Sequence, residues 1–88
     1  MKIEFLKKFY KDLDKITTNN LKSDLMNVIL EIEKHKDITE IKNMIKMKNS
    51  KNAFRIKLGD YRIGVYIEKN TIEFARFAHR KDIYKMFP

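Results

Sequence analysis

Arginine is the side chain in this sequence that is best suited to binding phosphate. The planar guanidinium carries paired N–H donors that match the geometry of a phosphate group. Although most of the cationic residues are lysines, all the arginines lie in the C-terminal half of the chain. They are Arg55, Arg62, Arg76 and Arg80. Their grouping predicts a site for a phosphate-bearing ligand.

The excess of positive charge follows the arginines. The chain has 88 residues, with 20 Lys and Arg against 12 Asp and Glu, so its formal net charge is +8. Residues 1–44 hold 9 cations and 8 acids, which gives +1, whereas residues 45–88 hold 11 cations and 4 acids, which gives +7. An asymmetry of this size indicates a polyanionic partner for the C-terminal half.

Other side chains near the arginines add chemistry of their own. His79 precedes Arg80, and a cationic neighbourhood favours the neutral imidazole, which can accept a proton. An edge or capping histidine is the alternative. Tyr84 or Tyr66 offers an aromatic ring beside the cations. Arg76 lies in an apolar stretch, where it either lies under a partner's surface or pairs with a carboxylate.

Composition excludes several other kinds of site. The chain has no cysteine, which excludes a disulfide framework, a thiolate zinc site and a cysteine nucleophile. Two histidines are too few for a His-rich metal site, and we expect neither a metal nor a cofactor. No apolar run approaches the roughly 18 residues of a membrane span, and the charged N-terminus lacks the apolar core of a secretory signal. We therefore expect a cytoplasmic protein without a membrane segment.

The N-terminal half has the apolar periodicity of helices. After a short start at residues 2–5, apolar residues recur on one helical face over residues 5–16 and again over residues 21–36. The polar stretch 17–20 between them predicts a hairpin of antiparallel helices. Asp37 and Glu40 have the spacing of a capping box, so residues 37–48 form either a short third helix or an irregular connection.

The C-terminal half changes to the period of two that is typical of strands. Residues 54–58 and 61–68 alternate, and Gly59-Asp60 between them is a favoured two-residue hairpin turn. Lys69-Asn70 makes the next turn, and residues 71–78 form a third strand. These strands predict an antiparallel meander, after which a tail of residues 79–88 leaves the sheet.

Helices followed by strands predict an α+β fold in one domain, residues 1–88, with an N-terminal helix hairpin packed on a small antiparallel β-sheet. Because strand side chains alternate between faces, Arg55, Lys57 and Arg62 then project from the open face of the sheet. Arg80 reaches the same end. Alternating Arg and Lys is equally typical of a strand face that is simply solvated.

Two segments together resemble a known family. The residues FRIKLGDYRI at 54–63 and FAHRKDIY at 77–84 resemble the RelE/ParE superfamily of toxins from type II toxin–antitoxin systems, and the RelE-like branch more narrowly. The resemblance covers the whole chain and is strongest over residues 50–88. It implies a toxin that enters the ribosomal A site and cleaves mRNA without a metal. A ParE-like inhibitor of DNA gyrase, which shares the fold and cuts no RNA, is the alternative.

The resemblance also implies the phosphate-binding residues. A basic pair on the first meander strand falls on Arg55 and Lys57, although the archetype of the family has Lys at both positions. The Arg of the GDYR segment falls on Arg62, and the Arg at the end of the third strand falls on Arg80. The tail aromatic of the family falls on Tyr84.

Cleavage by attack of a 2′-OH needs a base, an acid and cations around the pentacovalent phosphate. Arg55 and Arg62 are then the cations, and Lys57 or His79 is the base. Arg80 binds phosphate or acts near the leaving oxygen. We expect Tyr84 to stack on a base or to orient it, and such stacking is worth on the order of 1–3 kcal/mol.

The resemblance further implies a partner protein. Members of the family are neutralised by a cognate antitoxin whose C-terminal segment wraps the toxin in a hetero-oligomer. Because residues 45–88 of this chain carry a net charge of +7, we expect that segment of the antitoxin to be acidic.

Overall fold

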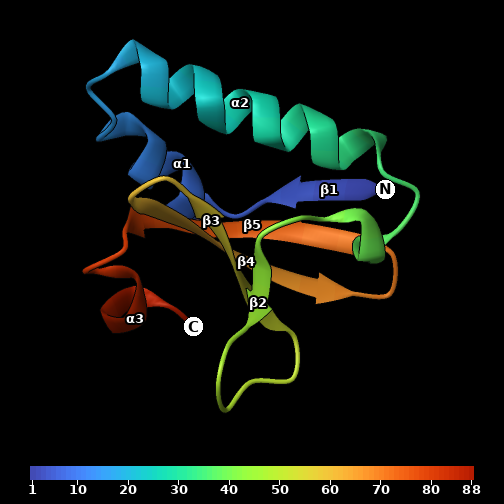
Figure 1. Ribbon diagram of the computed structural model, residues 1–88. Coiled ribbons are helices and arrows are strands. Elements are labelled where there is room, and N and C mark those ends of the chain that lie inside the picture. The colour runs from blue at the N-terminus through green and yellow to red at the C-terminus, as the bar shows by residue number, and fades with distance from the viewer.

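The computed structural model describes residues 1–88 and has one five-stranded sheet, with the two longer helices on one face and a short C-terminal helix on the other (Figure 1). The strand order is β1-β5-β4-β3-β2. The strands are β1 (Lys2–Phe5), β2 (Met44–Lys46), β3 (Ala53–Leu58), β4 (Tyr61–Glu68) and β5 (Thr71–His79). The helices are α1 (Lys7–Asp14), α2 (Asn19–Lys34) and α3 (Ile83–Met86), and a 3-10 turn at Ile38–Glu40 follows α2. No helix combines the length and the apolar character that crossing a membrane requires.

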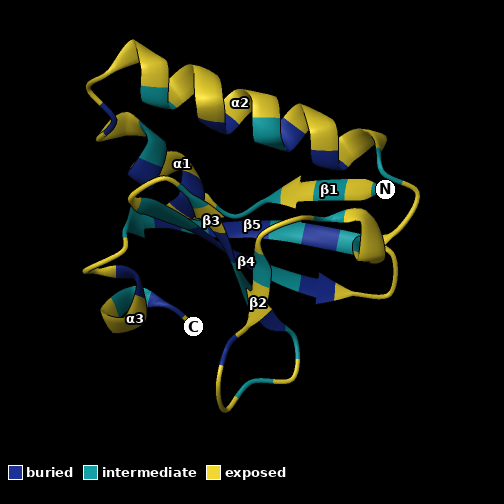
Figure 2. Ribbon diagram, viewed as in Figure 1, coloured by how far each residue is buried: buried dark blue, intermediate teal, exposed yellow.

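The main core lies between the helices and the sheet. Figure 2 shows buried positions on the sheet side of α1 and α2 and along the central strands. Phe9, Leu25 and Ile29 contribute from the helices, and Ile63, Val65 and Phe74 are among the strand residues that meet them. This arrangement confirms the predicted α+β fold, in which a helix hairpin covers one face of the sheet.

The predicted meander is present. β3 pairs antiparallel with β4, and β4 pairs antiparallel with β5. The observed strands match the predicted ranges to within one residue at each end. In the turn between β3 and β4, Gly59 has a φ of 57°, a conformation that a residue without a Cβ adopts freely.

Two short strands lie outside that meander and correct the prediction. β1 pairs in parallel with β5, from Lys2 opposite Thr71 to Phe5 opposite Phe74, so the sheet is mixed and not purely antiparallel. β2 pairs antiparallel with β3 within the segment expected to be a helix or an irregular connection. The capping box of Asp37 and Glu40 is present, but it begins only the single 3-10 turn. The backbone of the residues that follow finds its partners on the edge of β3.

α1 contacts the C-terminal half of β5, along the edge where β1 no longer pairs with it. The Phe77 N–H donates to Asp12 Oδ2 at 2.9 Å, and Arg76 donates to both oxygens of the same carboxylate, from Nε at 2.8 Å and from Nη2 at 3.2 Å. A register shift opposite Gly64 and Val65 accompanies this contact. Asp12 is only 4% exposed, and its hydrogen bond raises the pKa of Arg76. Of the two expectations for Arg76, pairing with a carboxylate is therefore confirmed.

The C-terminal tail returns to the face of the sheet opposite α1 and α2. Ile83 and Phe87 are buried there in a second, smaller cluster with Met47, Ala53 and Ala75. Only the part of this face that the tail does not cover is therefore open to solvent. The expectation of a fully open face did not allow for the apolar residues of the tail, which need a surface to pack against.

Gly64 makes the room for that tail. A Cβ at this position would lie 2.8 Å from Cγ and Cδ2 of the Phe87 ring, closer than van der Waals contact allows. The ring of Phe87 also lies against Tyr66, with 5.1 Å between the ring centroids. Because Gly64 has no side chain, the ring of Phe87 can pack against β4 at this position.

Candidate functional site

Three of the expected phosphate-binding side chains share one groove. β3 presents Arg55 and Lys57 on the face away from the main core, and β4 places Arg62 opposite Lys57 in the ladder. Together with the start of β2 they line a groove of about 390 Å³. The two-residue turn between β3 and β4 fixes the register, so the cations converge because of where the hairpin turns.

Arg62 is held by the turn beside it. Its Nη1 donates to the carbonyl oxygens of Gly59 at 2.9 Å and Tyr61 at 2.8 Å. These two bonds fix the orientation of the guanidinium and leave Nε and Nη2 without a partner in the chain. A planar fork held in this way is preorganised to bind an anion.

Arg55 connects this groove to a second one that contains Tyr84. The Arg55 Cζ lies 5.9 Å from the centroid of the Tyr84 ring, within the range of a cation–π contact. Tyr84 comes from α3 and is 60% exposed. The second groove has a volume of about 490 Å³ and lies between the tail and the segment from β2 into the following loop. Because Arg55 lines both grooves, they meet at its side chain.

Arg80 lies at the same hairpin turn. Its backbone N–H donates to the carbonyl oxygen of Asp60 at 2.8 Å, and its Nε is 4.0 Å from Asp60 Oδ1. Both side chains of this pair are more than half exposed, and such pairs contribute little stability. The turn of Gly59 and Asp60 therefore contacts both Arg62 and Arg80, while the Arg80 side chain stays accessible to a ligand.

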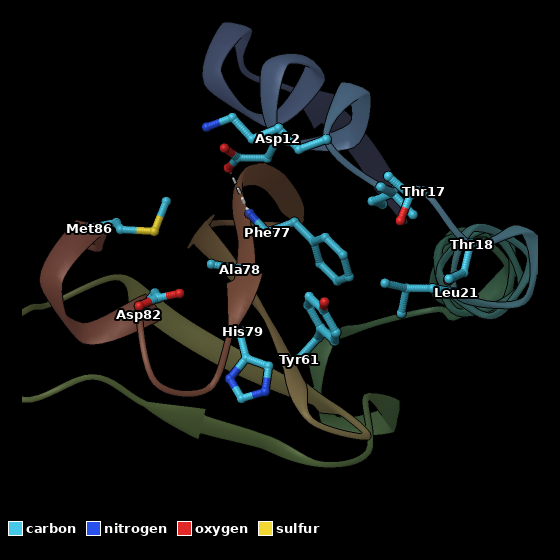
Figure 3. Close-up of a pocket in the computed structure, with 12 residues that line it drawn as sticks. Asp12, Thr17, Thr18, Leu21, Tyr61, Phe77, Ala78, His79, Asp82 and Met86 are labelled. Carbon is cyan, nitrogen blue, oxygen red and sulfur yellow. Dashed lines mark hydrogen bonds between the residues drawn. The ribbon is translucent and has the colours of Figure 1, made fainter.

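His79 lies outside the groove that Arg55, Lys57 and Arg62 line. It pairs with Tyr61 across the ladder, and its ring meets the Tyr61 ring edge-on, with the centroids 5.4 Å apart. Its Nδ1 accepts a hydrogen bond from the Lys81 N–H at 3.2 Å. Figure 3 shows His79 among the residues around a different cavity of about 300 Å³, between the α1–α2 turn, the end of β5 and the tail. His79 lines neither of the grooves that Arg55 lines.

Sequence reasoning did not anticipate the wall that β2 contributes. The carbonyl of Asn43, a residue with a φ of 62°, accepts a hydrogen bond from the Lys57 N–H at 3.0 Å. Ile45 lies opposite Arg55 in the ladder and is 54% exposed. Ile45 could have indicated this wall, because it is an apolar residue that the predicted core does not use. A strand of three residues is, however, too short to show the alternation by which strands are recognised in a sequence.

The cations of the groove are not neutralised within the chain. The three ion pairs of the structure join Lys2 to Glu4, Asp12 to Arg76 and Asp60 to Arg80. Arg55, Lys57 and Arg62 therefore have no carboxylate within 4.0 Å. The arrangement offers fixed positive charge, one amine that can exchange a proton, and an exposed aromatic ring. That combination suits a phosphodiester and its base.

Two sequence comparisons identify relatives. The family described as the ParE toxin of the type II toxin–antitoxin system parDE matches residues 3–84. The chain is 37% identical over 89 residues to Toxin RelE3 of Methanocaldococcus jannaschii, and the alignment covers 100% of both proteins.

Solved structures agree with the sequence relatives. The crystal structure of a RelB–RelE antitoxin–toxin complex from Methanococcus jannaschii contains a chain with a TM-score of 0.80 and 34% identity, covering 97% of this chain and 99% of that one. The archaeal RelE–RelB complex from Pyrococcus horikoshii gives a TM-score of 0.71 at 17% identity, covering 93% and 97% of the two chains, and supports the fold. The chain therefore belongs to the RelE/ParE superfamily of toxins from type II toxin–antitoxin systems.

Proposed function

We propose that this toxin is a ribosome-dependent mRNA endonuclease of the RelE-like branch. The observation that carries the proposal is the groove in which Arg55, Lys57 and Arg62 converge without a carboxylate partner, next to the exposed ring of Tyr84. The identity of 37% to a protein named Toxin RelE3 supports the same branch. A cluster of unpaired cations beside an exposed aromatic ring suits the cleavage of RNA better than it suits binding to gyrase.

The proposed reaction is an attack of a ribose 2′-OH on the adjacent phosphodiester. The 2′-oxygen loses its proton to a base and bonds to phosphorus, and the bond from phosphorus to the 5′-oxygen breaks as that oxygen takes up a proton. The products are a 2′,3′-cyclic phosphate and a 5′-OH. Arg55 and Arg62 stabilise the added negative charge, which fixed donors do more effectively than water because they need no reorganisation.

Lys57 is the candidate base that the geometry favours. Arg55 and Arg62 stay protonated in proteins, so Lys57 is the cation of the groove that can lose a proton. The rival candidate, His79, lines a different cavity. Arg80 binds the phosphate at the hairpin turn, and Tyr84 stacks on a base of the message.

We also propose that a cognate antitoxin neutralises the toxin in a hetero-oligomer. Two of the related structures described above are complexes of a RelE chain with a RelB antitoxin. The charge of +7 over residues 45–88 predicts that the antitoxin covers this half with an acidic C-terminal segment.

A translation reaction tests the proposal. We expect the toxin to fragment mRNA only when ribosomes are present, and Arg62→Ala to lower the cleavage rate by about 10²–10³-fold, the usual effect of removing a fixed donor to a transition-state oxyanion. Lys22→Ala, an exposed residue of α2, is the control for the loss of one positive charge. Inhibition of gyrase supercoiling with intact mRNA would instead support the ParE-like alternative and overturn the proposal.

A further inference from the structure

One stretch of the chain contains cations and no acid at all. Between residues 41 and 59 there are six Lys and Arg and no Asp or Glu. This stretch comprises β2, β3 and the loop that joins them, residues 47–52. Its cations are Lys42, Lys46, Lys48, Lys51, Arg55 and Lys57. Only Arg55 and Lys57 have a role in the reaction proposed above, so the remaining lysines need a separate account.

The loop that carries two of these lysines has a defined conformation. Met47 is buried, and its N–H donates to the Ala53 carbonyl oxygen at 2.8 Å. The Ala53 N–H donates in turn to Ser50 Oγ at 3.0 Å, and the Asn52 side chain donates to Glu68 Oε1 at 3.0 Å. The loop projects away from the body of the sheet (Figure 1). Its backbone is therefore held in place while its tip faces solvent.

The lysines of this loop are exposed and unpaired. Lys48 and Lys51 are exposed, and no carboxylate lies within 4.0 Å of either. Lys46 and Lys48 line the groove of about 490 Å³ to which Arg55 and Tyr84 also belong. A line of uncompensated positive charge thus runs from the proposed cleavage site, through Arg55, onto the loop.

We propose that the loop of residues 47–52, with Lys46 at its base, binds the phosphate backbone of the same RNA strand that is cut. A strand with a base on Tyr84 and a phosphate at Arg55 continues along the shared groove to Lys48 and then Lys51. Lysine is a mobile point charge that neutralises phosphate without reading sequence. This inference rests on the proposed function and adds a binding surface for the substrate beyond the site of cleavage.

Salt dependence measures these contacts directly. The probe is a single-stranded nonanucleotide with 2′-O-methyl groups, which the toxin cannot cut. Each phosphate neutralised on a single strand contributes about 0.7 to the slope of log K against log salt. We therefore expect Lys48→Gln/Lys51→Gln to lower that slope by about 1.4, because two contacts are lost.

A matched control separates local contacts from net charge. Lys22→Gln/Lys34→Gln removes two exposed lysines from α2, on the other side of the sheet. Both double variants have a net charge of +8 − 2 = +6. We expect the α2 variant to keep the wild-type slope and both variants to keep the wild-type melting temperature, because all four side chains are exposed.

A shorter probe locates the contacts along the strand. A 2′-O-methyl trinucleotide fills the groove that Arg55, Tyr84 and Lys48 line without reaching Lys51 farther along the loop. We expect the single variant Lys51→Gln to bind this trinucleotide as the wild type does and to bind the nonanucleotide more weakly at low salt. Equal losses for the two probes would show that the loop is not an extension of the track and would overturn the inference.

Other outcomes also distinguish this inference from its alternatives and from the proposed function. An unchanged slope for the loop variant, or no measurable binding of the nonanucleotide to the wild type at low salt, contradicts the inference. Normal RNA binding with a weakened affinity for the antitoxin would assign the loop to an acidic protein segment. A loss seen only on ribosomes would assign it to ribosomal RNA. If the wild type binds the nonanucleotide as expected but cuts no mRNA on ribosomes, the proposed function fails and the binding track stands.

Discussion

Arg55, Lys57 and Arg62 line the same groove but differ in what they can do with a proton. A guanidinium stays charged throughout catalysis, so Arg55 and Arg62 are suited to holding phosphate oxygens. The orientation of Arg62 is fixed by two backbone carbonyls, whereas Lys57 makes no side-chain hydrogen bond within the chain. In the proposed reaction, the residue assigned to exchange a proton is therefore the one whose side chain is not held by a hydrogen bond.

The exchange of Lys57 for arginine tests this division of roles. Lys57→Arg keeps the positive charge in the groove and removes the group that can lose a proton. We expect the single-turnover cleavage rate on ribosomes to fall by about 10²–10⁴-fold, the contribution of a general base, with RNA binding little changed. His79→Gln is the companion variant. Loss of cleavage in His79→Gln with retention in Lys57→Arg would assign the base to the histidine.

Among the secondary-structure elements, α1 and β5 depend on one carboxylate for their contact. Asp12 is nearly inaccessible and satisfies both a backbone N–H of β5 and the guanidinium of Arg76. Removal of one member of a buried ion pair leaves the other without its partner and typically costs about 3–5 kcal/mol. The contact also closes the edge of β5 that lies beyond the end of β1.

Asp12→Ala should therefore lower the free energy of unfolding by about 3–5 kcal/mol. Urea denaturation measures this loss. Asp14→Ala removes the same charge from an exposed position of the same helix and should change the stability by less than about 0.5 kcal/mol. Equal effects of the two substitutions would show that the buried contact does not stabilise the fold.

Gly64 allows a second prediction about elements, because it lies under Phe87. Gly64→Ala brings a methyl group into the Phe87 ring, and such overpacking typically costs about 1–3 kcal/mol. We expect the tail to leave the sheet and become sensitive to trypsin at Lys85. In a Phe87→Ala background the added methyl group should have little further effect. A tail that stays protected in Gly64→Ala would contradict this account.

The elements also show how far the sequence predicts the structure. The meander was predictable because each of its strands is long enough to alternate, and Gly59-Asp60 set the register that gathers Arg55, Lys57 and Arg62. β1 and β2 were not predictable, since three or four residues show no period. The placement of His79 away from the groove and the pairing of Asp12 with Arg76 depend on tertiary packing that no local pattern encodes.

Over the molecule as a whole, positive charge is concentrated in the C-terminal half of the chain. The half that contains α1 and α2 has a net charge of +1, whereas the half that contains the meander and the tail has +7. The cations of the groove lie on the face opposite those helices. An approaching polyanion is therefore attracted to one side of the molecule, and such steering raises association rates by about 10–10³-fold.

Association with the antitoxin should show this steering. We expect the association rate constant of toxin and antitoxin to fall at least about 10-fold between low and high ionic strength. Stopped-flow fluorescence measures the rate. Replacement of the acidic residues in the C-terminal segment of the antitoxin by glutamine should remove most of the salt dependence. A rate that is independent of salt would mean that charge does not guide this encounter.

The parallel pairing of β1 with β5 determines when this protein can finish folding. Lys2 lies opposite Thr71, a separation of 71 − 2 = 69 positions in a chain of 88 residues. Contacts that join distant parts of a chain form late and slow the folding of a domain. β1 therefore stays unpaired until residues 71–74 of β5 are available to it, and the sheet that supports the groove is completed late in folding.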